Sequence, residues 1–335
     1  MSLPITLILY FLSAAALVYF SMKCADYVDL LDKKTNLSGA FIGGVILAAI
    51  TSLPELVTSI SAITVVNNPE LIGGNVLGSN VFNLCIFGAT TALSVKAFAN
   101  AKIGKAHIKT IICTILADIL MLATFIIGAT NTRVPYIQIN AASFVILIIY
   151  FVSLRFLAND DSENDEEDDS PLTVKQIAIR FVLMAIGLVG MSFLVTYFTD
   201  IIDQKLGLGA SLAGAIFLGV VTSLPELASS ITLVRKRNFN AMVGNVVGSN
   251  MFNFTIFSIS DFIAGKKMVY SPNPDNATFN MLYFGIISTI FVAVSILLQN
   301  HFKKTNPTKG AKLATYIVLG VAVLVSYLAC MILSR

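Results

Sequence analysis

Long apolar runs, separated by short polar segments, make up nearly the whole chain. Because about 30 Å of hydrocarbon needs roughly 20 residues of helix to cross it, each run of that length predicts a membrane-spanning helix. The runs are apolar on nearly all faces, as helices in lipid or in a bundle core are. Ten spans are predicted, at residues 3–22, 38–66, 71–94, 108–129, 136–157, 174–199, 208–234, 240–264, 279–299 and 312–333. The expected fold class is therefore an all-α polytopic membrane protein.

Spans two and seven are each interrupted by a proline followed by a glutamate. The segment TSLPEL occurs at residues 51–56 and again at residues 222–227. Pro54 has no amide hydrogen, so the carbonyl of Ile50 loses its helical partner, and Pro225 has the same effect in span seven. We therefore expect helices 2 and 7 to be broken.

The two interruptions belong to an internal repeat. GVILAAITSLPELVTSIS at 44–61 aligns with AIFLGVVTSLPELASSIT at 215–232, and GGNVLGSNVFN at 73–83 matches VGNVVGSNMFN at 243–253. Five spans separate the copies, and because five is odd, the second copy enters the membrane from the opposite side. Inverted repeats with interrupted helices are typical of secondary transporters. The chain is thus predicted to contain two inverted five-helix repeats.

An acidic segment, NDDSENDEEDDSP, separates spans five and six. It holds eight acidic residues between Asp160 and Asp169. Such a charge run is typical of a solvated linker. The predicted units are an N-terminal repeat at 1–157, a linker at 158–172 and a C-terminal repeat at 173–335. Calcium sensing by the linker remains an alternative, although the segment lacks the ordered spacing and turn glycine of a calcium loop.

The distribution of positive charge predicts the orientation in the membrane. If the N-terminus is outside, 17 of the 22 lysines and arginines lie at the cytoplasmic ends of the spans. The positive-inside rule then places both termini outside and the acidic linker in the cytoplasm of a multi-pass cell-membrane protein.

Composition agrees with a membrane protein and excludes several other classes. Hydrophobic residues make up 56% of the chain and charged residues only 12%, against about 25% charged in soluble domains. The net charge of +3 is too small to suggest a nucleic-acid partner. Four scattered cysteines indicate neither a disulfide nor a metal site. No nucleophile–base pair or zinc motif accompanies the glutamates, so we expect neither an enzyme nor a bound cofactor.

The repeated segments contain the polar groups that could hold a cation. Glu55 follows Ser52 and Thr51 at three and four residues, so the three share one helix face with the freed backbone. The second copy repeats this arrangement with Thr222, Ser223 and Glu226. The partner spans carry polar stripes at four-residue spacing: Asn75, Ser79 and Asn83, and Asn245, Ser249 and Asn253. An all-oxygen set of this kind suits Ca²⁺ or Na⁺.

Small residues near these segments have two interpretations. The pairs Gly74 with Gly78 and Gly244 with Gly248 favour close helix packing. The positions of Ala48 and Gly219, before each glutamate, are compatible with packing or with presenting a carbonyl.

The charge of the glutamate pair indicates a mechanism. One Ca²⁺, two protons or several Na⁺ would neutralise the two carboxylates, whereas the empty dianion would be costly in a low-dielectric barrier. A carrier whose site changes its open side only when a cation is bound must exchange one cation for another, and is an obligatory exchanger.

The paired motifs TSLPEL with GNVLGSNVFN and TSLPEL with GNVVGSNMFN resemble the α-repeats of the cation/calcium exchanger superfamily, and within it the prokaryotic sodium/calcium exchanger-like proteins. The resemblance implies a ten-helix antiporter in which spans 2, 3, 7 and 8 form four adjoining cation sites. It also implies that the long first and sixth helices slide past the other eight.

The same resemblance implies the roles of individual residues. Glu55 and Glu226 would bind Ca²⁺ with the carbonyls of Thr51 and Thr222. The middle position would hold Asn83 and Asn253. The Na⁺ sites would be lined by Ser79, Ser249, Ala48, Gly219, Ser52 and Ser223.

Two departures from the family pattern bear on the mechanism. Ile50 and Val221 stand where members usually have glycine, and Asn253 stands where many have aspartate. The neutral Asn253 makes potassium co-transport less expected and leaves Na⁺ or H⁺ as the coupling ion.

The expected function is a Ca²⁺ antiporter, coupled to Na⁺, that exports Ca²⁺ from the cytoplasm. The first alternative is a Ca²⁺/H⁺ exchanger in which both glutamates titrate, and a cation channel is the alternative from another class. The expected partners are the lipid bilayer and the transported ions, and a monomer is compatible with the sequence.

Overall fold

The chain is almost entirely helical. The computed structural model describes residues 2–35, 38–64, 69, 71–159, 170–206, 220–265, 268–272, 274–305 and 307–334. Within this part of the chain, extended structure is limited to an isolated antiparallel bridge between Arg133 and Asn140. The helices are α1 (Leu3–Lys34), α2 (Gly39–Phe41), the π-helix η1 (Ile42–Leu47), α3 (Ala48–Thr51), α4 (Leu53–Thr64), α5 (Leu71–Leu93), α6 (Val95–Asn100), α7 (Ala106–Ile127), α8 (Ala141–Ala158), α9 (Val174–Leu206), α11 (Val220–Thr222), α12 (Leu224–Arg235), α13 (Phe239–Ala264), α14 (Asn276–Thr305) and α15 (Lys309–Leu333).

Eight helical segments of the described residues are long and apolar enough to cross a membrane. They are Leu3–Lys34, Gly39–Thr64, Ile72–Leu93, Ala106–Ile127, Ala141–Ala158, Val174–Leu206, Asn276–Gln299 and Lys309–Leu333. The predicted span 240–264 coincides with α13, which is a long helix but is not one of these eight. The predicted span 208–234 begins outside the described residues and continues as α11 and α12. A count of ten spans therefore stays a prediction, as do the predicted unit boundaries, and the acidic segment 160–169 lies outside the described residues.

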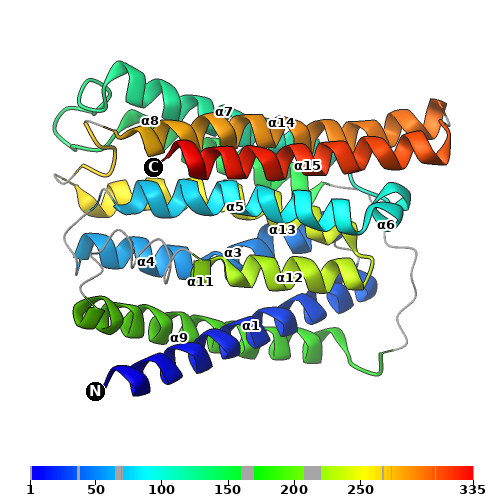
Figure 1. Ribbon diagram of the computed structural model, residues 1–335, viewed down its shortest axis with the longest axis horizontal. Helices are drawn as coiled ribbons and strands as arrows, with labels where there is room; N and C mark the ends of the chain where they lie inside the picture. Colours follow the sequence, from blue (N-terminus) through cyan, green and yellow to red (C-terminus); the bar gives the residue numbers. More distant parts are fainter. Residues whose placement is uncertain are drawn as a thin grey trace.

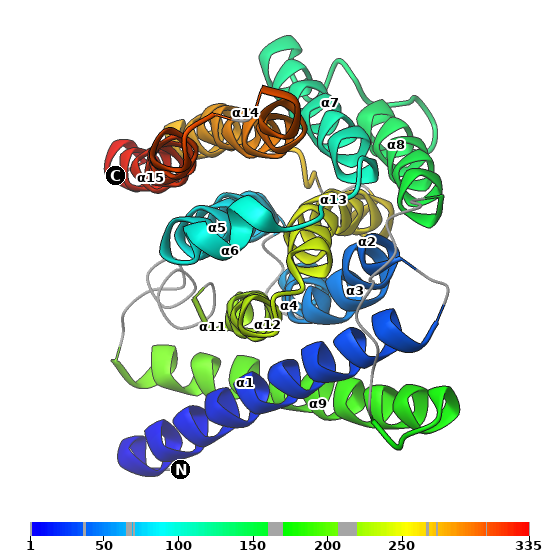
Figure 2. The same cartoon turned by 90° about the vertical axis from the view of Figure 1, so that its right-hand side faces the viewer.

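The helices form three layers (Figures 1 and 2). Helices α7, α8, α14 and α15 lie on one side, and α1 and α9 cross each other on the opposite side. Between them lie α5, α13, α12 and the broken segment α2–α4. The two ends of the chain lie at the same end of the bundle (Figure 1). The outer layers expose apolar side chains of the kind that face lipid, such as Phe11, Ile148, Ile186 and Val318.

Helix α13 lies at the centre of the bundle because small residues allow the broken segment to pack against it. A Cβ added to Gly43 would lie 2.3 Å from the Ala241 carbonyl oxygen, and one added to Gly248 would lie 2.0 Å from the Gly44 oxygen. A Cβ on Gly244 would lie 2.8 Å from the Gly44 nitrogen. The predicted close packing of Gly244 and Gly248 is therefore confirmed, and the π-helix η1 is the segment they contact.

For the first copy of the motif the close packing stays a prediction, because the segment that corresponds to η1 lies within residues 207–219, outside the described residues. Among the described residues, a Cβ on Gly74 would meet no atom within 4 Å, and one on Gly78 would lie 3.8 Å from the Met281 sulfur, which is ordinary contact. The contacts of the described residues thus differ between the two copies. The reason is that α13 contacts the broken segment across glycines on both sides, whereas the corresponding face of α5 has no such neighbour among the described residues.

Both broken helices are interrupted at the serine that precedes the Leu-Pro-Glu sequence. Helix α3 ends at Thr51, Ser52 adopts φ −89° and ψ 6°, and α4 begins at the next residue. In the second copy, Ser223 adopts φ −91° and ψ 0° between α11 and α12. The predicted interruptions are thus present in the described residues, and each proline lies in the first turn of the following helix, where its missing amide hydrogen is tolerated.

Helix α1 extends twelve residues beyond the predicted end of the first span, to Lys34. Its last turns place two carboxylates, Asp29 and Asp32, in buried positions against the residue that caps α13. Asn238 Nδ2 donates to Asp32 Oδ2 at 2.7 Å and to Asp29 Oδ1 at 3.2 Å. Lys33 and Lys236 also approach Asp29, each at 3.4 Å. These contacts fix one end of α1 to the connection between α12 and α13.

Candidate cation site

Two buried glutamates lie at the start of the helices that follow the breaks. Glu55 is in the first turn of α4 and Glu226 is in the first turn of α12, and each is only 1% exposed. The N-terminus of a helix carries partial positive charge, which stabilises a carboxylate there. The break therefore gives each carboxylate a helix terminus inside the bundle, which an uninterrupted span would not provide.

Each glutamate is held by a serine from the other half of the chain. Ser52 Oγ donates to Glu226 Oε1 at 3.0 Å, and Ser223 Oγ donates to Glu55 Oε1 at 3.3 Å. Ser79 on α5 also donates to Glu55 Oε1, at 3.2 Å, and lies 3.2 Å from the Ser223 hydroxyl. These hydroxyl and carboxyl groups form a polar network between α4, α5 and α12.

The threonines of the two TSLPEL segments take part in the same crossed arrangement. Thr222 interacts with Glu55, and Thr51 interacts with Glu226. Both threonines are buried. The sequence prediction that these segments come together is consistent with this geometry.

Several oxygen atoms at the centre have no hydrogen-bond donor within the described residues. They are Glu55 Oε2, Glu226 Oε2, Asn83 Oδ1 and Asn253 Oδ1. All four side chains are at most 1% exposed. A buried acceptor without a donor costs about 1–3 kcal/mol, and more if it is charged. A bound cation can satisfy buried oxygens of this kind.

Two further asparagines belong to this centre and were not predicted from the sequence. Asn253 Nδ2 donates to Asn80 Oδ1 at 2.9 Å, and Asn250 Nδ2 donates to the Asn80 carbonyl at 3.2 Å. Asn80 thereby fixes the amide of Asn253 so that its oxygen remains available. The signal was present in the sequence, since an asparagine follows the serine in both Gly-Ser-Asn segments.

Asn75 and Asn245, the first asparagines of the two polar stripes, join neighbouring helices. Asn75 donates to the Glu55 carbonyl and to Ser59 Oγ, both at 3.2 Å, and so connects α5 with α4. Asn245 donates to Ser229 Oγ at 3.0 Å and to Ser230 Oγ at 3.3 Å, and so connects α13 with α12.

The carbonyl of Ala48 faces α13, and both interpretations of this residue, packing and presenting a carbonyl, apply. It accepts a hydrogen bond from Ser249 Oγ at 3.4 Å and from Thr51 Oγ1 at 3.3 Å. Ala48 is fully buried, so the residue packs and also presents its carbonyl to the polar region. Gly219, its counterpart in the second copy, lies outside the described residues.

The carboxylates have no positively charged partner in the described part of the chain. The ion pairs found there are formed by Lys23, Lys33 and Lys236 with aspartates of α1. The described residues also contain no group of three His, Cys, Asp or Glu side chains that could hold a metal. Any cation at this centre would therefore be held by two carboxylates together with hydroxyl, amide and backbone oxygens.

Comparison with known proteins matches nearly all of the sequence to one family. Residues 5–158 and 177–335 match the family described as "Sodium/calcium exchanger protein". An uncharacterized membrane protein of Methanocaldococcus jannaschii, MJ0091, is 29% identical over 72% of this chain and 76% of its own length. The human sodium/potassium/calcium exchanger 5 is 25% identical over 57% of this chain and 35% of its own length.

A solved structure shares the fold. The sodium-calcium exchanger NCX_Mj superimposes with a TM-score of 0.71 and 21% identity, over 100% of both chains. At this identity the likeness establishes the fold, and the family match covers nearly all of the sequence. This chain therefore belongs to the sodium/calcium exchanger protein family.

Proposed function

We propose that the chain is a Ca²⁺ antiporter, coupled to Na⁺, that exports Ca²⁺ from the cytoplasm by alternating access. The observation that supports this most is the pair of buried glutamates, each hydrogen-bonded by a serine of the opposite half and each left with one carboxyl oxygen without a donor among the described residues. The family match and the named exchangers among the relatives support cation exchange as the reaction class.

The proposed Ca²⁺ ligands begin with the carboxyl groups of the two glutamates. Glu55 and Glu226 supply two negative charges, which one Ca²⁺ balances. The backbone carbonyls of Thr51 and Thr222 would complete the shell. Hydroxyls would serve the flanking Na⁺ positions, from Ser52, Ser223, Ser79 and Ser249, with the backbones of Ala48 and Gly219. Asn83 and Asn253 would occupy the middle position.

Exchange, as opposed to free flow, follows from the charge of the site. With both carboxylates ionised and no cation bound, the centre has two uncompensated charges away from water, which is strongly unfavourable. With Ca²⁺ or with Na⁺ ions bound, the charge is neutralised, and the site can change the side of the membrane to which it is open. An empty site would therefore not complete the cycle, and transport in one direction requires a return load.

A Ca²⁺/H⁺ exchanger is the second candidate. The same unpartnered oxygens, Glu55 Oε2 and Glu226 Oε2, could each hold a proton on the return step. Na⁺ is preferred as the proposal because the hydroxyls of Ser52, Ser79 and Ser223 surround the carboxylates and add oxygen ligands that a proton does not need.

The proposal includes two inverted five-helix repeats and a cytoplasmic acidic linker. The crossed hydrogen bonds between the two TSLPEL segments support a pseudosymmetric pair of broken helices. The position of both chain ends at the same end of the bundle (Figure 1) agrees with an even number of spans. The lysine and arginine distribution then favours termini outside.

Uptake of radioactive Ca²⁺ into proteoliposomes tests the proposal. Vesicles preloaded with Na⁺ are compared with vesicles that have a proton gradient and no Na⁺, each with and without a protonophore. Na⁺-driven uptake that survives the protonophore is the expected result. Uptake driven only by protons would establish the second candidate. Uptake with neither gradient, along the Ca²⁺ gradient alone, would indicate a channel and overturn both.

A further inference from the structure

A buried carboxylate in the middle of a membrane-length helix lies outside the proposed cation site. Asp118 is in the middle of α7 and is 4% exposed. No hydrogen bond or ion pair to its side chain is found within the described part of the chain. Carboxylates at such depth are costly when charged, and are usually functional. The mechanism proposed above leaves Asp118 without a role.

The neighbouring helices leave space for this carboxyl group. A Cβ added to Gly285 on α14 would lie 3.7 Å from Asp118 Oδ1, so the bare backbone of α14 faces the carboxyl directly. The same Cβ would lie 4.0 Å from Val81 on α5. Ser288, three residues further along α14, is 1% exposed, and its hydroxyl has no hydrogen-bond partner among the described residues.

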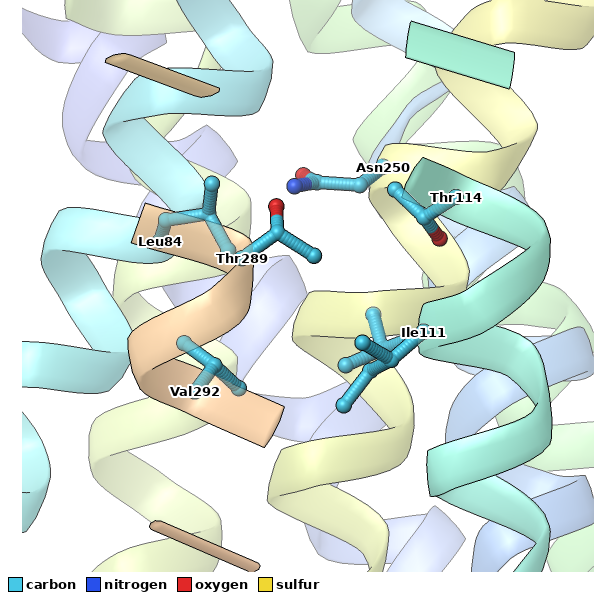
Figure 3. Close-up of a pocket in the computed structure, with 7 residues that line it drawn as sticks. Leu84, Ile111, Thr114, Asn250, Thr289 and Val292 are labelled. Atoms are coloured by element: carbon cyan, nitrogen blue, oxygen red, sulfur yellow. The ribbon is translucent and has the colours of Figure 1, made fainter. Parts of the chain in front are cut away.

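A narrow pocket lies near this region, between α5, α7, α13 and α14 (Figure 3). It is lined by Leu84, Ile111, Thr114, Val247, Asn250, Thr289 and Val292. Thr114 lies one helical turn before Asp118, and Thr289 one turn after Gly285. The amide of Asn250 points into the space between these two threonines (Figure 3), and its Oδ1 is buried without a donor in the described residues.

Asn250 also belongs to the polar network of the cation site. Its Nδ2 donates to the Asn80 carbonyl, and Asn80 Oδ1 holds Asn253. One asparagine therefore lines the pocket near Asp118 and is hydrogen-bonded to Asn80, the residue that holds Asn253.

Asp118 is a single carboxyl group, and one proton neutralises it without any further ligand. We propose that Asp118 is a proton-binding site behind the cation site, and that it releases its proton when Ca²⁺ binds. This inference rests on the proposed function only in taking Ca²⁺ as the cation that binds.

The physical link is electrostatic. A divalent cation at Glu55 and Glu226 adds positive charge to the same low-dielectric interior, which favours the ionised form of Asp118 over the protonated form. Binding of Ca²⁺ and binding of the proton therefore oppose each other, and by linkage the opposition is reciprocal.

Other ionisable groups lie on the helices that pack around α7, and none of them has an electrostatic interaction with Asp118 among the described residues. They are His107, Lys109 and Cys113 on α7, Tyr150 and Arg155 on α8, Asp261 on α13, Tyr283 and His301 on α14, and Cys85 on α5. A proton count that changes on substitution of Asp118 is therefore attributable to Asp118.

Calorimetry of Ca²⁺ binding to the detergent-solubilised protein tests the proposal. Titrations in buffers of different ionisation enthalpy give the number of protons released per Ca²⁺ bound. Asp118→Asn is expected to release fewer protons than the wild type when it binds Ca²⁺. Each proton released makes the Ca²⁺ affinity rise by up to about tenfold per pH unit, so the affinity of the variant should rise less steeply with pH than that of the wild type. Asp118→Glu should restore the release, and Asp275→Asn, at an exposed carboxylate, should leave it unchanged.

An unchanged proton count in Asp118→Asn would overturn the proposal and leave the exchanger function intact. Failure of the wild type to bind Ca²⁺ would instead contradict the proposed function. If Asp118→Asn does not fold, infrared spectra of wild-type protein with ¹³C-labelled aspartate replace it. Loss of a protonated aspartate carbonyl band when Ca²⁺ is added is expected, and an unchanged aspartate spectrum would exclude the proposal.

Discussion

At the residue scale, each carboxylate of the candidate site depends on a hydroxyl from the opposite half. Glu226 Oε1 accepts from Ser52, and Glu55 Oε1 accepts from Ser223 and Ser79. The second oxygen of each glutamate has no donor within the described residues. The site is thus half satisfied by protein groups and half open to a cation, which makes the two glutamates the most sensitive positions to neutral substitution.

Replacement of either glutamate by glutamine should abolish Ca²⁺ exchange. Glutamine keeps the size of the side chain but removes one of the two charges that balance Ca²⁺. We expect Glu55→Gln and Glu226→Gln to lose Ca²⁺ uptake in proteoliposomes while eluting as folded protein on size-exclusion chromatography. The exposed control Asp275→Asn should transport normally. A glutamine variant that exchanges at the wild-type rate would remove that glutamate from the site.

Asn253→Asp should make transport more sensitive to pH. Asn253 Nδ2 now donates to Asn80 Oδ1 at 2.9 Å, and an ionised aspartate would place two acceptors against each other. The protonated aspartate can still donate, so the variant should resemble the wild type at low pH and slow down as pH rises. The initial rate of Ca²⁺ uptake across a pH series measures this. An identical pH profile in variant and wild type would place Asn253 outside the site.

At the scale of elements, the packing of the broken segment against α13 depends on backbone contact. A Cβ on Gly248 would lie 2.0 Å from the Gly44 oxygen, and backbone cannot move aside as a flexible side chain can. The π-helix η1 lies where this contact is closest. Close contact between the two segments therefore sets the position of Ala48 and of the break that follows it.

Gly248→Ala should destabilise the bundle, whereas Gly74→Ala should not. Overpacking of this kind costs about 1–3 kcal/mol or more, and we expect a lower melting temperature in detergent. Gly74 is exposed, and none of the described residues would lie within 4 Å of a Cβ added to it. Alanine there should be neutral or stabilising by up to about 1 kcal/mol, since it favours the helix. Equal melting temperatures for the two variants would contradict the packing described for α13.

The broken helices and the glutamate site were predictable because their signals are local. A proline interrupts a helix wherever it falls within one, and a glutamate is costly in a membrane-length apolar run unless it binds something. The repetition of both residues indicates a paired arrangement. The end of α1 was not predictable in this way. Its aspartates and lysines resemble a loop, and they become helical because Asn238, distant in sequence, hydrogen-bonds both Asp29 and Asp32.

The same difference, between local sequence signals and contacts of residues distant in sequence, explains why two asparagines were not predicted. Asn80 and Asn250 lie one residue after the serines of the polar stripes, off the four-residue spacing that defines a helix face. They face each other only because α5 and α13 pack closely at this level. The differing environments of Gly74 and Gly244 likewise depend on tertiary neighbours, which identical motifs do not specify.

At the scale of the whole molecule, α1 and α9 form a layer of their own against the central helices (Figure 2). These are the two helices that the family resemblance predicts to slide. The layer is fixed at one end by the contacts of Asp29 and Asp32 with Asn238. Movement of the layer during transport stays a prediction, whereas the arrangement that would allow it is present.

Cysteine labelling should establish the orientation in the membrane. Tyr136, which is fully exposed, lies between α7 and α8, and Arg237, also exposed, lies between α12 and α13. With the native cysteines replaced, we expect Tyr136→Cys to react with an impermeant maleimide in intact cells. Arg237→Cys should react only after permeabilisation. Labelling of both positions in intact cells, or the reverse pattern, would contradict termini outside.

The crossed serine–glutamate hydrogen bonds also bear on how such a chain can be divided. Because each half supplies a hydroxyl to the carboxylate of the other, each half expressed alone would lose that contact. Glu226 would lose Ser52, whereas Glu55 would lose Ser223 and keep Ser79. Two separate polypeptides, ending and starting within the acidic segment, would contain every group of the site only as a heterodimer. The crossed bonds thus lead us to expect that a divided chain transports only when both pieces are produced together.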